Sequence, residues 1–459
     1  MTESSQVLDS TKQKEGASLA RFLLPSLLGV LMFLVPFTVD GKVTIGMGVL
    51  ADWLKSLADA YLVTFIAYLT LVAGVVSLMM RLWRPTLAED GKATALLRLF
   101  DVSWTWTLIR FAGGIFAVMT YHKFGLEPVY NGYTGGTILH ELAPTIFIYL
   151  AVAVVLLPVL TDYGLMEFVG TFLQRIFQKV FRLPGRSAID VLASWMGAGT
   201  VGVLITAQQY DKGFYSQREA AVIATNFSIV SVAFCLVIAR FVNIDHLFVP
   251  YYLSVCVVGI ITAIIVPRLP PLSRLPQTYF AGRQLAESAE HETLTGIPLA
   301  LQRACQRAAQ ADPIGKQAKH SALNIVDIWM GLFPAVMAIG TVALILNEYT
   351  PIFQYLSYPF VPLLELLRLP EAQAAAPAMI VGFADMFLPA VIGKGIESEL
   401  TRFVIAGMSV SQLIYMSEIG VLILKSNIPL NVRQLLAIFL LRTLISLPLL
   451  ALAGHIIVG

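Results

Sequence analysis

The sequence predicts an all-α polytopic membrane protein with about nine transmembrane helices, two re-entrant hairpins and an inverted repeat. Three observations predict this class. The 459-residue chain is 57% hydrophobic and 13% charged, with a mean hydropathy of +0.76, whereas soluble domains are about 25% charged. Apolar runs long enough to cross a bilayer recur along the whole chain, and two similar series of elements flank a polar stretch. Membrane lipids are therefore expected around the protein.

The predicted crossings are apolar runs that approach the roughly 20 residues needed to span about 30 Å of hydrocarbon. They lie near residues 19–39, 59–80, 102–121, 140–160, 219–240, 247–267, 324–347, 400–424 and 432–457. Two more apolar stretches, 188–209 and 374–394, are interrupted by Gly, Pro and polar residues. We expect a re-entrant hairpin or a broken helix at each, because irregular backbone survives at membrane depth only where protein or a watery cavity covers it.

The segments outside the crossings divide the chain into five parts. Residues 1–18 are polar, and no small-residue cleavage pattern follows the first apolar run, so we expect a disordered tail rather than a signal peptide. Next come N-terminal helices outside the repeat (19–121), a first repeat (137–267), a linker (268–320) and a second, inverted repeat (321–459). The linker is Pro-rich and mixed in charge, with a short helix expected near 297–310.

Basic residues predict the orientation of the chain. Lys and Arg gather in the segments 81–98, 164–186 and 268–320. If both hairpins return to the side that they entered from, these segments share one face with the N-terminus. The positive-inside rule then places that face in the cytoplasm, which makes 268–320 a cytoplasmic linker.

The repeat is visible in two short markers. T-D-Y-G at 161–164 precedes Arg182-Leu183-Pro184, and N-E-Y-T at 347–350 precedes Arg368-Leu369-Pro370 at the same spacing. Between the markers, apolar positions at helical spacing predict a helix in the membrane interface, and a hairpin follows each. Each unit crosses the membrane an odd number of times in this layout, so the second copy is expected to be upside down.

Four motifs resemble a known family: L-P-S-L-L-G-V near 24–30, G-A-G-T-V-G-V-L-I-T, G-F-A-D-M-F-L-P-A and S-Q-L-I-Y-M-S-E-I-G. Here the chain resembles the YjiH-like bacterial inner-membrane proteins of the wider nucleoside-recognition, or Gate-domain, group, over nearly its whole length. Similar segments occur in concentrative nucleoside transporters, spore-maturation membrane proteins and the permease part of the ferrous-iron transporter. The resemblance implies a multi-pass protein of the bacterial inner (cytoplasmic) membrane but leaves the solute open. No G-x-x-x-x-G-K-[ST] loop is present, which disfavours GTPase-linked iron transport.

The predicted solute site lies between the two hairpins, because inverted repeats with discontinuous elements place the substrate near the bilayer midplane. Glycines permit close backbone approach, and hydroxyl, amide and carboxylate groups supply hydrogen bonds. The small polar residues have an alternative role in bonds between helices. The candidate substrate-binding residues are Ser194, Gly197, Gly199, Thr200, Thr206, Gln208, Asn226, Asp385, Ser411 and Gln412.

Asp385 and Glu418 are the candidates for coupling to H⁺ or Na⁺. A carboxylate inside a membrane segment is costly and usually faces a cavity, where it can carry a proton or bind a cation. The structural alternative for Glu418 is an ion pair with Arg442 or Lys425. Lys394, at the end of the second hairpin, has the alternative of reaching water as a snorkelling side chain. Between the N-terminal helices, Arg110 and Glu141 are expected to form a structural pair.

These features favour a secondary active transporter that moves a small polar solute, nucleoside-like or another small organic molecule, by alternating access. The alternative is a non-transporting membrane assembly or signalling protein on the same scaffold. No catalytic motif and no metal-ligand spacing occurs, so we expect no enzyme activity, no metal and no other cofactor. A net charge of +2 gives no reason to expect a nucleic-acid partner. The sequence leaves open whether the protein forms a homo-oligomer.

Overall fold

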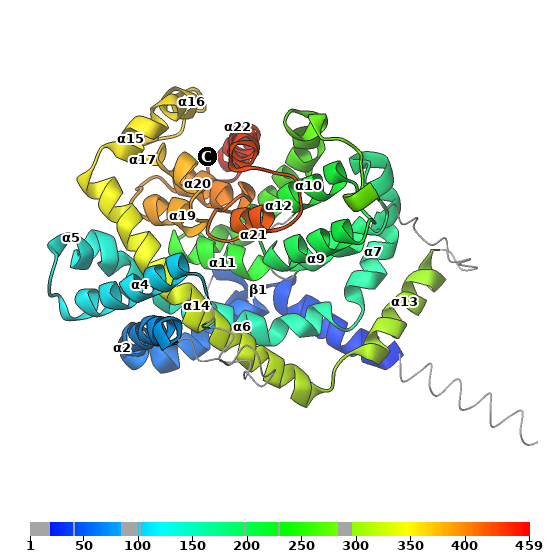
Figure 1. Cartoon of the computed structure of the whole chain (residues 1–459), viewed down its shortest axis with the longest axis horizontal. Helices are drawn as coiled ribbons and strands as arrows, with labels where there is room; N and C mark the ends of the chain where they lie inside the picture. Colours follow the sequence, from blue (N-terminus) through cyan, green and yellow to red (C-terminus); the bar gives the residue numbers. More distant parts are fainter. Residues whose placement is uncertain are drawn as a thin grey trace, which may run out of the picture.

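The computed structural model describes residues 19–39, 42–83, 100, 102–196, 199–227, 230–282 and 296–459. This part is helical apart from a hairpin of two antiparallel strands, β1 (Pro36–Val39) and β2 (Lys42–Ile45). The helices pack into one body in which they run in several directions (Figure 1). Within the described ranges, five helices are long and apolar enough to cross a membrane: Gly46–Trp83, Glu127–Thr161, Asp245–Arg268, Ile314–Tyr349 and Val432–Ile457.

The N-terminal region packs through glycines. The helix Leu19–Phe33 ends before β1, so the predicted crossing 19–39 is shorter than expected. Helices α2 (Gly46–Trp83) and α4 (Trp104–His122) lie against each other. A Cβ on Gly113 of α4 would lie 1.8 Å from the carbonyl oxygen of Pro334 in α14 (Ile314–Tyr349). Such close backbone approach is typical of helix packing in membranes.

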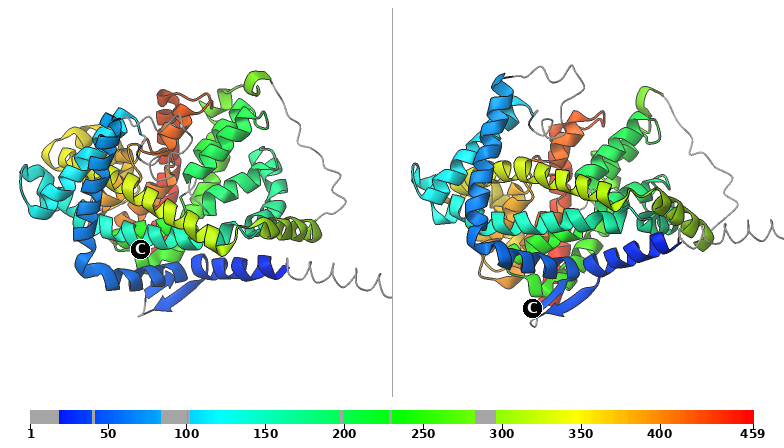
Figure 2. Two further views of the ribbon diagram at one scale, coloured as in Figure 1. Left: turned by 60° about the horizontal axis from the view of Figure 1, so that its bottom comes forward. Right: turned by 90° about the horizontal axis from the view of Figure 1, so that it is seen from below.

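Two series of elements follow one another in the same order: a long helix, short helices, a hairpin, a broken helix and another long helix (Figures 1 and 2). The first series, after α5 (Glu127–Tyr130) and the π-helical segment η1 (Gly132–Leu142), is α6 (Ala143–Thr161), α7 (Leu165–Ile176), η2 (Phe177–Phe181), α8 (Ser187–Met196), α9 (Gly199–Asp211), α10 (Gln217–Asn226), α11 (Val232–Phe241) and α12 (Phe248–Ile265). The second is α14, α15 (Ile352–Ser357), α16 (Val361–Leu366), α17 (Ala372–Ala375), α18 (Ala378–Val381), α19 (Phe387–Lys394), α20 (Glu399–Ser411), α21 (Ile419–Lys425) and α22 (Val432–Ile457).

The predicted crossings 219–240 and 400–424 are not continuous helices. The first is split between α10 and α11, and the second between α20 and α21. We call the non-helical residues 227, 230 and 231 the first break and the segment 412–418 the second break. The prediction of continuity was wrong because average hydropathy over a crossing is insensitive to a few non-helical residues.

A helix cap at the first break and contacts with another segment at the second break give hydrogen-bond partners to backbone groups near these breaks. At the first break, the Ser231 side chain accepts a hydrogen bond from the Phe234 N–H at 3.4 Å and caps α11. At the second break, the backbone N–H groups of Met416 and Ser417 donate to the second hairpin, to the carbonyls of residues 383 and 384 at 2.8 and 3.0 Å. Backbone groups freed from the helix therefore keep hydrogen-bond partners, which membrane depth requires.

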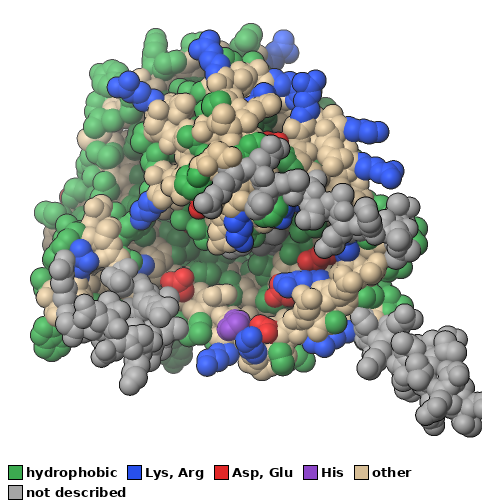
Figure 3. Space-filling model, turned by 45° about the vertical axis from the view of Figure 1, so that its right-hand side comes forward, with side chains coloured by type: hydrophobic (Ala, Val, Ile, Leu, Met, Phe, Trp, Pro, Cys, Tyr) green, Lys and Arg blue, Asp and Glu red, His purple; other side chains and the backbone are tan. Residues whose placement is uncertain are grey.

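The linker contains α13 (Ile297–Gln310), which matches the short helix predicted there. It packs on α7, where a Cβ on Gly164 would lie 2.3 Å from the Ala304 carbonyl oxygen. Arg307 of α13 lies 3.6 Å from carboxylate oxygens of both Asp162 and Glu167. Lys and Arg side chains are spread along the upper and right-hand edges of one face of the molecule (Figure 3). The cytoplasmic location of the basic segments 81–98, 164–186 and 268–320 stays a prediction.

Candidate functional site

A cavity of about 270 Å³ is lined by both hairpins and both helix breaks. Gly199, the first residue of α9, comes from the first hairpin, and Met386 comes from the second. Ser231 belongs to the first break, and Tyr415 and Glu418 belong to the second. Hydrophobic side chains of α6 and α14 form much of the remaining wall. Elements from both series therefore surround one space, which we call the central cavity.

Glu418 brings a carboxylate to the central cavity. It precedes α21 and is half-buried, and its side chain does not cap the N-terminus of that helix. Within the described ranges, no ion pair joins it to Arg442 or Lys425, so the structural alternative considered for this residue is not formed. A half-buried carboxylate that lines a cavity without a cationic partner is suited to binding a proton or a cation.

Asp385 lies at the start of the second half of the second hairpin. One carboxylate oxygen accepts a hydrogen bond from the backbone N–H of Phe387 at 2.8 Å, which fixes the turn into α19. Asp385 is close enough to Glu418 for the two carboxylates to interact electrostatically. The two predicted ion-coupling residues are thus near each other, although they come from different elements. Each lies in a segment where the helix is interrupted.

The predicted residues Asn226, Ser411 and Gln412 are buried, and each makes a hydrogen bond within the protein, Asn226 and Gln412 through their side chains and Ser411 through its backbone carbonyl. Arg442 of α22, also fully buried, donates from Nη1 to Asn226 Oδ1 at 2.9 Å. Its Nε and Nη2 donate to the Ser411 carbonyl at 3.1 and 2.7 Å. Gln412 Nε2 donates to the Thr443 hydroxyl at 3.0 Å. The structure brings these three residues together around α22, and none of them lines the central cavity.

The predicted residues at the tip of the first hairpin have different outcomes. Gly199 lines the central cavity, and its role in solute binding stays a prediction. Gly197 lies outside the described residues, and the side chain of Thr200 is likewise outside the part that the structure describes. Both stay predictions.

The other predicted residues of this hairpin do not line the central cavity. Ser194 is buried, and its hydroxyl has no hydrogen-bond partner among the described residues. It packs against Gly202, where a Cβ would lie 2.4 Å from the Ser194 Oγ. The Thr206 hydroxyl donates to the Gly202 carbonyl at 2.7 Å within α9, and Gln208 is exposed. The structure therefore assigns Ser194 and Thr206 to packing within the hairpin.

Glu141 pairs with Lys394, whereas a pair with Arg110 was expected. The ion pair joins η1 to the last residue of the second hairpin. Arg110 instead interacts electrostatically with Asp327 of the neighbouring α14. Both Glu141 and Lys394 line a second cavity of about 510 Å³, which also holds polar side chains of α14, α15 and α17, including Gln373.

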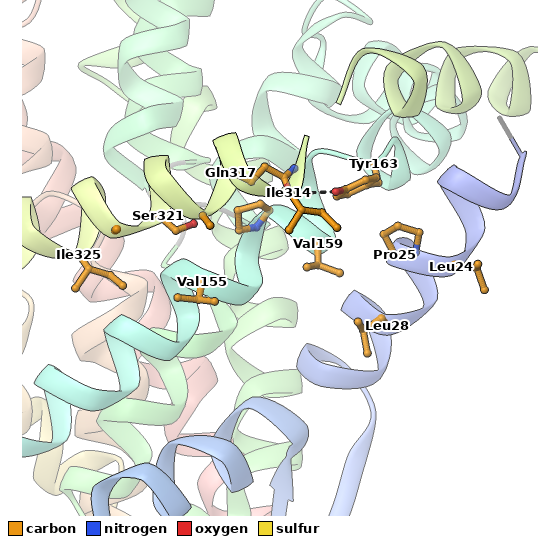
Figure 4. A pocket seen from close by; sticks show the side chains of 13 residues that line it. Leu24, Pro25, Leu28, Val155, Val159, Tyr163, Ile314, Gln317, Ser321 and Ile325 are labelled. Atoms are coloured by element: carbon orange, nitrogen blue, oxygen red, sulfur yellow. Dashed lines mark hydrogen bonds between the residues drawn. The ribbon is translucent and has the colours of Figure 1, made fainter. Parts of the chain in front are cut away.

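A third cavity, beneath the N-terminal helix, is lined differently from the second cavity, which holds several polar side chains. Its volume is about 550 Å³, and Leu24, Leu28, Val159 and other hydrophobic side chains form most of its surface (Figure 4). Its polar groups include the Tyr163 hydroxyl, which donates to Gln317 at 3.0 Å. This lining suits the hydrocarbon of a membrane lipid. The central cavity is also largely apolar, but it holds the Glu418 carboxylate and is lined by both hairpins and both breaks, so it is the stronger candidate for a solute site.

Sequence reasoning did not select Met386, Tyr415 or Thr443 as site residues, and it considered Arg442 only as a partner for Glu418. A usable signal was present in S-Q-L-I-Y-M-S-E at 411–418, where four polar residues and a tyrosine interrupt an apolar run. So many polar residues within eight positions indicate an irregular segment rather than a continuous transmembrane helix.

Comparison with known proteins gives two matches. The family model for Gate domains, described as nucleoside recognition, matches residues 143–245. The chain is also 51% identical over 438 residues to the uncharacterized protein BpOF4_10220 of Alkalihalophilus pseudofirmus. That alignment covers 95% of this chain and 94% of the relative. No solved structure matches the chain.

Proposed function

Since the chain belongs to the Gate, or nucleoside recognition, group of membrane proteins and to one family with BpOF4_10220, we propose that it is a secondary active transporter of a small polar solute. It works by alternating access in the bacterial cytoplasmic membrane, and its substrate is nucleoside-like or another small organic molecule. The observation that carries the proposal is the central cavity, which both hairpins and both breaks line.

The arrangement of helix ends supports binding of a polar solute in the central cavity. Gly199 is the first residue of α9, Ser231 caps the N-terminus of α11, and both residues line the cavity. Helix N-termini carry partial positive charge and free N–H groups, which interact with electron-rich groups of a solute. Discontinuous helices use their ends in this way in secondary transporters.

Asp385 and Glu418 support coupling to H⁺ or Na⁺. Two neighbouring carboxylates without an ion-pair partner in the described ranges repel each other, and a bound proton or cation relieves that repulsion. Because they lie on the second hairpin and the second break, cation binding can change how these two segments pack. We propose that this links the ion to movement of the hairpin.

A thermal-shift screen of the purified protein is the first test, because a ligand that binds the folded state raises its apparent stability. The screen covers nucleosides, amino acids, polyamines, organic acids and divalent metals, with and without Na⁺. Uptake of each hit into proteoliposomes follows, with Asp385→Asn and Glu418→Gln as test variants and the exposed Glu365→Gln as the control. We expect both test variants to fold and to lose uptake or its ion dependence.

Normal ion-coupled uptake by both variants would remove the proposed roles of the two carboxylates. A folded protein that binds no compound of any class would instead favour the assembly or signalling alternative. That alternative also predicts an Asp385 sealed in an ion pair. Asp385 forms none with any residue that the structure describes, and its carboxylate accepts a hydrogen bond from the backbone N–H of Phe387.

A further inference from the structure

We infer that Arg442 and Thr443 of α22 form a clamp that joins both broken helices, so that the second hairpin and the first break move together. Arg442 is a positioning residue in this inference, because it contacts the ends of helices and does not line the central cavity. The inference rests on the proposed function, since alternating access requires the two repeats to change conformation together.

Arg442 joins one residue from each repeat. Its Nη1 binds the Asn226 side chain at the C-terminus of α10, and its Nε and Nη2 bind the Ser411 carbonyl at the C-terminus of α20. The Asn226 amide is held in place because its Nδ2 donates to the Val222 carbonyl at 3.3 Å and to the Thr225 hydroxyl at 3.0 Å. One guanidinium thus spans the ends of two helices that precede breaks.

Thr443 extends the clamp to the second hairpin. Gln412 Nε2 donates to the Thr443 hydroxyl at 3.0 Å and to the Met379 carbonyl of α18 at 2.8 Å. The Gln412 Oε1 lies so close to Gly382 that a Cβ there would be 1.9 Å from it. A continuous series of contacts therefore runs from the second hairpin through Gln412 and α22 to Asn226 in the first repeat.

The clamp has a symmetric part and an asymmetric part. Asn226 and Gln412 are separated by 186 residues, the offset that also relates Asp162 to Glu348 in the two repeat markers, so these buried amides are counterparts. The residues that bind them, Arg442 and Thr443, are neighbours on one helix. At the same offset, the counterpart of Arg442 in α12 is Cys256, which has no comparable donors. One helix therefore holds both amides.

The chemistry of arginine fits this position. A buried cation in a membrane protein is costly unless it is compensated. The C-termini of α10 and α20 carry partial negative charge and carbonyl groups without partners in their own helix, and both ends meet this guanidinium. The planar guanidinium donates in several fixed directions, whereas a lysine ammonium is a single nitrogen. Lysine at this position keeps the charge but does not span both helix ends.

The test perturbs the second hairpin and measures the first break. Gly382→Ala forces Gln412 to move, and the thiol of Ser231→Cys, in a full-length protein whose three cysteines are replaced by alanine, reports on the central cavity through its rate of reaction with a water-soluble maleimide. We expect Gly382→Ala to change that rate about tenfold, within the roughly 5- to 150-fold range of ordinary coupling between sites. With Arg442→Met the change falls below about twofold, whereas Arg433→Met, an exposed control on the same helix, preserves it.

Companion variants keep the test decisive if one protein does not fold. Asn226→Leu leaves the charge of Arg442 in place and removes its acceptor in the first repeat, and Thr443→Val perturbs Gln412 more mildly than Gly382→Ala. Arg442→Lys is expected not to restore coupling. The inference would be overturned if neither Gly382→Ala nor Thr443→Val changed the reaction rate of the Ser231→Cys thiol. It would also be overturned if Gly382→Ala changed that rate as much in proteins carrying Arg442→Met or Asn226→Leu as in the parent. The readout needs no substrate, so a failure of the transport proposal is separately visible as an absence of uptake.

Discussion

Gly382 is the position at which a single methyl group has the clearest predicted effect. It lies at the end of α18, with φ −57° and ψ −23°, which alanine adopts without strain. An alanine Cβ would lie 1.9 Å from Gln412 Oε1 and 3.2 Å from Pro389 Cγ. Since a Cβ and a nonbonded oxygen do not approach within 3.0 Å of each other, the Gln412 side chain must shift. The backbone is compatible with alanine, so the substitution perturbs this contact specifically.

The magnitude follows from what Gln412 loses. Its side chain is fully buried and makes hydrogen bonds of 2.8 and 3.0 Å to the Met379 carbonyl and the Thr443 hydroxyl. Buried polar groups left unpaired cost about 1–3 kcal/mol each, so loss of both bonds lowers the free energy of unfolding by about 2–6 kcal/mol. The smaller backbone entropy of alanine in the unfolded chain offsets up to about 1 kcal/mol. We therefore expect a net destabilisation of about 1–6 kcal/mol.

Denaturant or thermal unfolding of the purified protein measures this effect, with Gly395→Ala as the matched control in the same hairpin. A Cβ on Gly395 would lie 3.7 Å from the Ile392 carbonyl oxygen, an ordinary contact, so that variant should be as stable as the parent. In a Gln412→Ala background, Gly382→Ala should cost much less, because the clashing atom is gone. Equal stability of the Gly382 and Gly395 variants would refute the reasoning.

Two further predictions concern the arrangement of the repeats. Replacing Glu141 by Gln and Lys394 by Met, singly and together, should give a coupling energy of about 0.2–1 kcal/mol, because the pair is only partly buried. Denaturant titration of the four proteins measures it, and strictly additive effects would mean that no pair forms. Water-soluble thiol reagents should label Arg175→Cys and Glu365→Cys from opposite sides of the membrane, as the inverted repeat requires; labelling from one side would exclude an inverted topology.

Local properties of the chain predicted much of the architecture. Composition and apolar run length indicated a membrane protein, since burial in lipid requires about 20 apolar residues in each helix. The interruptions in 188–209 coincide with a pair of short helices, α8 and α9, and the short helix expected near 297–310 is α13. These features were visible because glycine, proline and helical periodicity act within one segment.

The partners of the site residues were not visible in the same way. The Arg442 guanidinium binds Asn226, 216 positions earlier in the chain, instead of Glu418. Lys394 pairs with Glu141, 253 positions earlier, although Arg110 was the expected partner of that glutamate. Sequence identifies which side chains need a partner at membrane depth, but several partners satisfy the same chemical requirement. Packing of the helices selects among them.

The sequence by itself therefore determined the class of protein, the long apolar helices, the repeated order of elements and the polar residues that need an explanation. Only the tertiary structure decided where the two crossings break and which polar residues line the central cavity. The physical reason is that a helix break is stable only when other segments bind its free backbone groups. At the second break those partners belong to the second hairpin, where the carbonyl oxygens of Phe383 and Ala384 accept hydrogen bonds from the backbone N–H groups of Met416 and Ser417.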